Sequence, residues 1–283
     1  MPHQPPPDRF QLVRDGASGV EAVRARFSGH AYDLHRHDEW LIGVTHRGVQ
    51  DFFCRGARQR STTGRVILIE PQEAHDGQAG AEGGFAYSML YLPRRWLSVA
   101  LADTPGGDPG FAATLQDDPA LARAIHAAWN ALAGGAPALA RDAALDAVLH
   151  RLRPHLGRPE RRPEASRDTR VARRARDRLH DMLASEIGAD ALARAAGAAD
   201  RFQLARAFRA AYGTAPHAYL VQQRLLRARQ MLAAGEAPAR VAAACGFADQ
   251  SHLGRWFRRA YGMAPGAYRA CCTGVPDRAA PPG

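Results

Sequence analysis

Two histidines separated by one residue, His35 and His37, are the residues of this 283-residue chain whose types and spacing most directly suggest chemistry. Alternate residues of a β-strand project to the same side, so on a strand these two imidazoles point together. His75 follows in the stretch IEPQEAHDG, and Glu39 stands beside the pair. Because neutral imidazoles bind metals or hydrogen-bond a polar ligand, the cluster is a candidate binding site.

Three interpretations of this cluster are open. In metal-binding cupins a His-x-His pair, a Glu and a later His hold the metal, and His35, His37 and His75 resemble part of that pattern. The Glu that this pattern needs a few residues after the pair is missing, because Leu41 and Ile42 stand there. We expect an effector pocket without metal or cofactor; a structural remnant and a metal site are the alternatives. The pocket residues expected are His35, His37, Glu39, Trp40, His75 and Tyr87.

All 38 basic residues are arginines, because the chain contains no lysine. This excludes Schiff-base chemistry on lysine and a P-loop lysine. Residues 167–270 contain 18 arginines against 8 acidic residues, a balance of +10 that equals the net charge of the whole chain. One region therefore carries the entire positive excess, as expected of a domain that binds a polyanion.

The basic region contains an internal repeat. DRFQLARAFRAAYGTAPHAYL, residues 200–220, returns at a constant offset of 49 as DQSHLGRWFRRAYGMAPGAYR, residues 249–269. Each copy predicts a helix rich in small residues, a tight turn near Gly197 or Gly246, and a second helix capped by Asp200 or Asp249. Helix, tight turn and helix with a cationic outer face is the sequence pattern of a helix-turn-helix.

The two copies agree at most positions that share one helix face and differ at most positions on the opposite face. The shared faces predict the core: Leu204, Ala207, Phe208, Ala211 and Tyr212 in the first copy, and Leu253, Trp256, Phe257, Ala260 and Tyr261 in the second. The opposite faces are polar or basic, as expected of two helices that read different base sequences in the major groove.

These motifs resemble the DNA-binding domain of the AraC/XylS family of bacterial transcription regulators, over about 100 C-terminal residues. The family's base-contacting positions fall on Phe202, Ala205, Arg206, Gln250, Ser251, Gly254 and Arg255. Three further arginines of the two helices are expected to contact phosphates: Arg201, Arg209 and Arg258. The resemblance implies a non-enzymatic regulator that binds promoter DNA and senses a small effector through an N-terminal cupin-like barrel. RNA polymerase, if the protein is an activator, and a homodimer are further partners.

The expected fold class is α+β with two domains. A cupin-like β-barrel or jelly roll, residues 8–156, ends in helices over about 115–156, which pack on the barrel or form a dimer contact. A linker, residues 157–169, leads to an all-α tandem helix-turn-helix domain, residues 170–271, and a disordered tail, residues 272–283. With no apolar run long enough to span a membrane, a cytoplasmic protein is expected. The alternative function is a cupin-type metalloenzyme or metal sensor fused to a DNA-binding domain.

Overall fold

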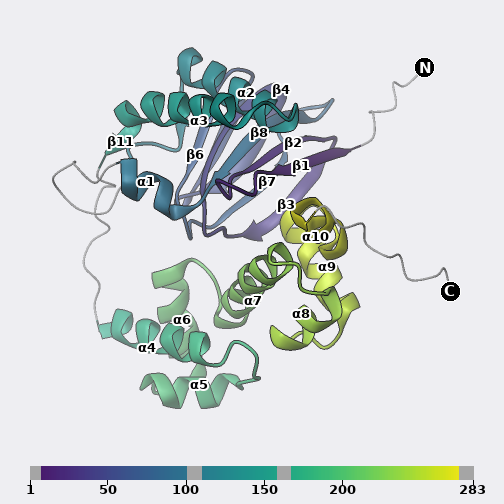
Figure 1. The fold of residues 1–283 in the computed structure, drawn as a ribbon. Coiled ribbons are helices and arrows are strands. Elements are labelled where there is room, and N and C mark those ends of the chain that lie inside the picture. Colours follow the sequence, from purple (N-terminus) through teal and green to yellow (C-terminus); the bar gives the residue numbers. More distant parts are fainter. Residues whose placement is uncertain (1–7, 101–109, 158–166, 274–283) are drawn as a thin grey trace, which may run out of the picture. The chain divides into compact units, whose positions relative to one another are not determined.

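The computed structural model describes residues 8–100, 110–157 and 167–273, and these divide into two compact units (Figure 1). One unit holds the described residues up to Gly157, and the other holds most of those from Arg167 on. The expected tail falls mostly outside the described residues. Within the described ranges, no helix is long and apolar enough to cross a membrane.

Short strands fill the range that the sequence predicted to be β-rich. They are β1 (Arg9–Arg14), β2 (Glu21–Phe27), β3 (His30–His35), β4 (Trp40–Cys54), β5 (Ala57–Thr62), β6 (Val66–Ile69), β7 (His75–Ala79) and β8 (Phe85–Leu92). Three two-residue strands follow: β9 (Gly110–Phe111), β10 (Leu115–Gln116) and β11 (Leu156–Gly157). β11 pairs with β9, so Gly157, the first residue of the expected linker, lies in a strand.

The sheet is open, so of the two expected forms, a barrel or a jelly roll, the N-terminal unit takes the second. Its main path runs in the antiparallel order β1-β2-β8-β4-β6-β10, and within the described residues β1 and β10 do not pair with each other. The 15-residue strand β4 joins two layers, because its first half pairs with β6 and β8 and its second half with β5 and β7. The N-terminal unit is therefore a jelly-roll-like double layer rather than a barrel.

Both faces of the sheet are buried, because successive residues of its strands alternate between two apolar clusters. Leu41 and Met89 belong to one cluster, here called the inner layer; Ile42 and Leu90 belong to the other, here called the outer layer. Helices α2 (Pro119–Ala133) and α3 (Ala138–Leu152) cover the outer layer, whereas α1 (Arg94–Ala100) follows β8. The expectation that two helices pack on the sheet is thus confirmed.

The second unit is helical, as expected. Its helices are α4 (Arg167–Asp181), α5 (Ala189–Ala196), α6 (Arg201–Tyr212), α7 (Pro216–Ala233), α8 (Pro238–Ala244), α9 (Gln250–Tyr261) and α10 (Pro265–Thr273). Figure 1 shows α7 running between α4, α5 and α6 on one side and α8, α9 and α10 on the other. The fold class is therefore α+β, with a sheet-rich N-terminal domain and a helical C-terminal domain.

Replacing Gly48 with alanine is expected to destabilise the sheet. Gly48 has a φ of 72°, and a Cβ at this position would lie 2.0 Å from the carbonyl oxygen of Gly84. The left-handed backbone alone costs a non-glycine residue roughly 1–2 kcal/mol. Separating β4 from β8 at this contact adds roughly 1–3 kcal/mol. The thermal unfolding midpoint, followed by circular dichroism, measures the loss.

Gly64→Ala is the matched control. Gly64 also has a positive φ, of 89°, but an added Cβ there meets nothing within 4 Å. This variant therefore reports the backbone strain without the steric clash. Equal losses in the two variants would show that the close approach of the two strands contributes nothing.

Candidate nucleic-acid interface and effector site

The two repeat copies fold into the same local frame. In α6 and α9 the carboxylates of Asp200 and Asp249 each accept a hydrogen bond, at 2.6 Å, from the amide three residues further on. Gly197 and Gly246, which end the preceding helices, both have a φ of 74°. Side-chain caps satisfy amide groups that a helix start leaves without partners, and glycine adopts the left-handed conformation without steric cost. The predicted caps and turns are thus present in both copies.

An aromatic pair fixes the same helices from the buried side. The ring of Phe208 in α6 lies 5.3 Å from that of Tyr219 in α7, in an edge-on arrangement. At the offset of 49, the ring of Phe257 in α9 lies 5.6 Å from that of Tyr268 in α10. All four residues are buried, and such pairs contribute about 0.5–1.5 kcal/mol beyond burial. Each pair buries one face of α6 or α9 in the core, and the opposite face of the helix is exposed to solvent.

The outward faces contain every residue that the sequence assigned to DNA contact. The structure exposes eight of them, and Ala205 and Gly254 are half-buried. The exposed eight are Arg201, Phe202, Arg206, Arg209, Gln250, Ser251, Arg255 and Arg258. Phe202 is 60% exposed, one of the two large hydrophobic side chains exposed in the described chain. Its ring lies 5.0 Å from the guanidinium of Arg201.

The arginines of these faces are available to an outside partner. In the described part of the chain, Arg206, Arg209, Arg255 and Arg258 make no ion pair with a carboxylate. An uncompensated guanidinium presents a planar fork of donors that suits phosphate or the major-groove edge of guanine. The two faces can therefore bind DNA both by charge and by hydrogen bonds to bases.

Helix α7 connects the two helix-turn-helix motifs. Its 18 residues span about 27 Å, close to the roughly 34 Å of one turn of DNA. The buried Arg224 of α7 donates hydrogen bonds to the carbonyls of Leu183, at 2.7 Å, and Ser185, at 3.0 Å. These bonds join α7 to the segment between α4 and α5. Helix α7 is therefore fixed to the first helix-turn-helix motif by hydrogen bonds as well as by the chain itself.

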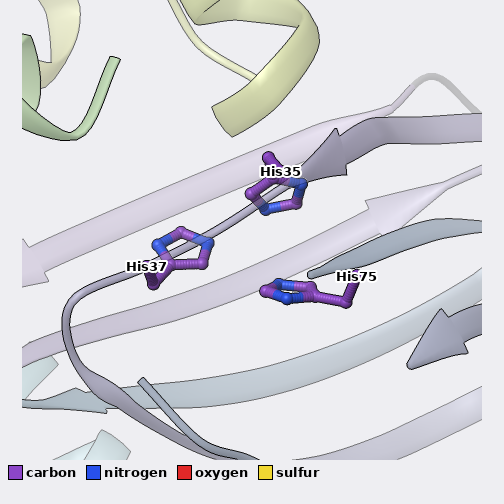
Figure 2. A group of neighbouring side chains, drawn as sticks. All are labelled: His35, His37 and His75. Atoms are coloured by element: carbon purple, nitrogen blue, oxygen red, sulfur yellow. The ribbon is translucent and has the colours of Figure 1, made fainter. Parts of the chain in front are cut away.

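The three expected histidines come together in the N-terminal unit (Figure 2). His35 of β3 and His75 of β7 are cross-strand partners, and their rings are 4.4 Å apart. His37 follows β3, and its ring lies 4.8 Å from that of His35 and 5.3 Å from that of His75. All three are buried. The pairing of β3 with β7 thus brings together residues that are 40 positions apart in the sequence.

Hydrogen bonds orient two of these rings. Nδ1 of His35 lies 2.7 Å from the carbonyl oxygen of Asp33, and Nδ1 of His75 lies 3.0 Å from that of Glu73. Since a carbonyl only accepts, both Nδ1 atoms carry a proton, and a neutral ring in this tautomer has its lone pair on Nε2. Burial lowers the pKa of His75 to about 4, with a smaller contribution from Arg36. His75 is therefore neutral at pH 7.

The cluster fits a metal ion only in part. Nitrogen atoms of the three rings lie within 4.8 Å of one another. Around a tetrahedral zinc, with bonds of about 2.0–2.1 Å, ligand atoms lie roughly 3.3 Å apart. The positive charge of Arg36 that lowers the pKa of His75 also opposes a cation. No carboxylate belongs to this group among the described residues, in line with the Glu that the sequence lacks after the His-x-His pair.

Of the other expected pocket residues, Tyr87 lies on the same layer and Trp40 does not. Tyr87 is buried in the inner layer, and its hydroxyl is 2.5 Å from that of Tyr32, whose ring lies 5.6 Å from His35. Trp40 packs in the outer layer against Phe111. The sequence analysis missed Tyr32, although its place in the strand pattern HAYDLH, three residues before His35, is visible in the sequence.

Comparison with known proteins gives two matches along the chain. Residues 18–153 match the family model of the AraC-like ligand binding domain, and residues 192–270 match that of a helix-turn-helix domain. No protein with a curated description matches the sequence significantly. The two matched ranges lie in the sheet-rich and the helical unit, respectively.

Several solved structures are similar. ToxT from Vibrio cholerae O395 is 11% identical, with 94% of this chain and 99% of that chain covered and a TM-score of 0.55. Unsaturated fatty acid bound ToxT from Vibrio cholerae strain SCE256 is 12% identical, with 95% and 98% covered and a TM-score of 0.54. The DNA-binding domain of AdpA, a global transcriptional factor, in complex with a target DNA is 33% identical over 36% of this chain and 90% of that chain, with a TM-score of 0.33.

The similarity to ToxT shows a shared fold for both units. The family matches add the two kinds of domain, in the order in which they follow one another in the chain. The chain belongs to the AraC/XylS family and is a DNA-binding transcriptional regulator, with an AraC-like ligand-binding domain ahead of its helix-turn-helix domain.

Proposed function

We propose that the outward faces of α6 and α9 read two segments of promoter DNA in successive major grooves. The observation that carries the proposal is the repetition of cap, turn and aromatic pair beneath two exposed faces that differ in sequence. Identical frames position both helices alike, whereas different side chains recognise different bases. A tandem reader thereby recognises an asymmetric site as a single chain.

The exposed residues divide into two roles. Arg206 and Arg255 stand at equivalent positions of the two helices and are the proposed base readers, since arginine binds guanine through two hydrogen bonds. Arg201, Arg209 and Arg258 are the proposed phosphate contacts. Three more side chains are assigned to base edges or to the groove floor: Phe202, Gln250 and Ser251.

In the N-terminal domain we place a polar effector against the three histidines and Tyr87. The lone pair of His75 at Nε2 accepts a hydrogen bond, and the neutral state of this ring suits an uncharged polar group. A ToxT structure contains an unsaturated fatty acid. A fatty acid is therefore one of the candidate effectors to be tested with this chain.

We also propose that the protein acts in the cytoplasm and has no enzymatic activity. An activator of this kind contacts RNA polymerase, and a second copy of the chain is a further partner. Selecting bound sequences from random double-stranded DNA tests the proposal as a whole. A single enriched, asymmetric motif supports it, whereas equal affinity for selected and bulk DNA would identify a non-specific architectural binder.

Removing a base reader should cost affinity only at the selected site. Arg206→Ala and Arg255→Ala are each expected to lose roughly 1–3 kcal/mol of binding there, with relaxed specificity at one position. Their affinity for random DNA should stay close to that of the wild type. Fluorescence anisotropy with both DNAs measures the difference, and equal losses on the two would contradict base reading.

Two arginine variants serve as controls for this experiment. Arg258→Ala should weaken all DNA alike and reduce the salt dependence of binding by about one unit of slope. Arg151→Ala removes an exposed arginine of α3, in the N-terminal domain, and should change neither measurement.

The variant Gly254→Ala is expected to change the stability of α9 and its affinity for DNA in opposite directions. Gly254 lies inside α9, and an added Cβ meets no atom within 4 Å. Alanine should therefore stabilise the helix by roughly 0.5–1 kcal/mol. We expect affinity for the selected site to fall several-fold at the same time, because the methyl group would occupy space that the DNA needs. A stabilised variant with unchanged affinity would exclude a close approach at this residue.

Metal analysis tests the absence of an enzyme centre. Protein purified without chelator is expected to carry iron, manganese and zinc well below one ion per chain, because the ring nitrogens are separated by up to about 4.8 Å and Arg36 adds positive charge beside them. Plasma emission spectroscopy measures the content. One iron or manganese ion per chain that is lost in His75→Gln would instead support a cupin-type metalloenzyme.

A further inference from the structure

A second polar cluster lies on the outer layer of the sheet, beneath α2, and shares no residue with the sites above. It combines Arg24 of β2, His46 of β4, Ser88 of β8 and His126 of α2. Arg24 and Ser88 are cross-strand partners, and the pairing of β4 with β8 shifts register at His46. Such irregularities redirect a side chain and are frequent next to functional sites.

Direct contacts join the four residues. Nε of Arg24 donates to Oγ of Ser88 at 3.1 Å, and Nε2 of His46 lies 2.7 Å from the same oxygen. The rings of His46 and His126 are 4.2 Å apart. Because the guanidinium only donates, Ser88 accepts from Arg24 and can give its own proton to neutral His46. His46 then carries its ring proton on Nδ1.

The cluster holds positive charge that no neighbouring carboxylate offsets. Among the described residues, Arg24, His46 and His126 make no ion pair with an acidic side chain. Burial, the neighbouring His126 and Arg24 together lower the pKa of His46 to about 4. Burial followed by Arg24 also lowers the pKa of His126. The two imidazoles are thus held neutral beside a fixed cation.

His46 and His126 open onto a pocket of about 700 Å³ between α2, β4 and the turn from β5 to β6. Arg65 and Arg123 also line this pocket, and Asp117, which is exposed, is its single acidic lining residue. Nε of Arg65 is buried and, within the described part of the chain, has no hydrogen-bond partner. Positive charge from Arg65 and Arg123 is therefore concentrated at one recess.

We propose that this pocket binds the anionic group of a small molecule, a carboxylate or a phosphate, between Arg65, His46 and His126. The inference goes beyond the proposed effector site at the three histidines and adds a second ligand site, for an anion, to the N-terminal domain. The anion accepts hydrogen bonds from the guanidinium of Arg65 and from the ring nitrogens. Arg24 supplies further positive potential from beneath the imidazoles.

Charge distinguishes this pocket from a metal site and from ordinary packing. A cation would meet Arg24, Arg65 and Arg123, so the pocket disfavours metal. An anion, in contrast, offsets their charge and stabilises the protonated imidazoles, which raises their pKa in the complex. Binding therefore takes up protons, and affinity is expected to increase as the pH falls from 7.5 to 5.5.

Calorimetric titration of the full-length protein with sodium benzoate and with inorganic phosphate, each at pH 7.5 and 5.5 and without DNA, tests the proposal. At least one anion should bind, more tightly at pH 5.5. Arg65→Gln should weaken anion binding roughly tenfold at both pH values, because the variant loses a hydrogen bond between charged groups. His126→Gln should reduce the gain between pH 7.5 and 5.5, because glutamine cannot take up the proton.

His150→Gln and Arg151→Gln are the matched controls, on exposed positions of α3 outside the pocket. Both should bind like the wild type. Binding of benzoate alone identifies a carboxylate site, and binding of phosphate alone a phosphate site. No binding of either, no pH dependence, or equal losses in pocket and control variants would overturn the proposal. Because DNA is absent, these results are independent of whether α6 and α9 read promoter DNA.

Discussion

The contact between a buried phenylalanine and a tyrosine eleven residues further along determines how each recognition helix is presented. Phe208 with Tyr219 and Phe257 with Tyr268 join a recognition helix to the helix that follows it. Once this face is fixed, the 3.6-residue periodicity decides which side chains face outward. The caps at Asp200 and Asp249 then fix where each helix begins. Sequence changes on the outer face leave this frame intact, so the two copies can diverge in what they bind.

Because the outer faces of α6 and α9 can change in sequence without disturbing the buried contacts, positive charge is located on these faces. The arginines of the outer faces have no carboxylate partners among the described residues, which costs little in water and leaves them available to phosphate. The buried Arg224 of α7 contrasts with them. Two backbone carbonyls satisfy it, so it serves the spacing of the motifs. Burial thus decides whether an arginine of this domain is satisfied by the backbone or stays exposed for an outside partner.

The sequence predicted the helical domain more completely than the sheet, for a physical reason. Helix caps, the turn glycines and the aromatic pair are local features, and the repeat shows each of them twice. In the sheet, the register of strand pairing decides which residues become neighbours. That His35 opposes His75, that Trp40 faces the outer layer and that a register shift falls at His46 all depend on strand pairing between distant segments. The open edge between β1 and β10 likewise has no local signal.

Strand β8 contributes a residue to each of the two candidate ligand sites of the N-terminal domain, on opposite faces of the sheet. Tyr87 faces the inner layer with the three histidines, and the next residue, Ser88, faces the outer layer with Arg24 and His46. A close-packed strand cannot shift on one side without changing the other. An effector that moves β8 from the inner layer would therefore alter the distance between Ser88 and His46. Linkage requires the reverse effect to be equal in free energy, so an anion in the outer pocket would change effector affinity by the same factor.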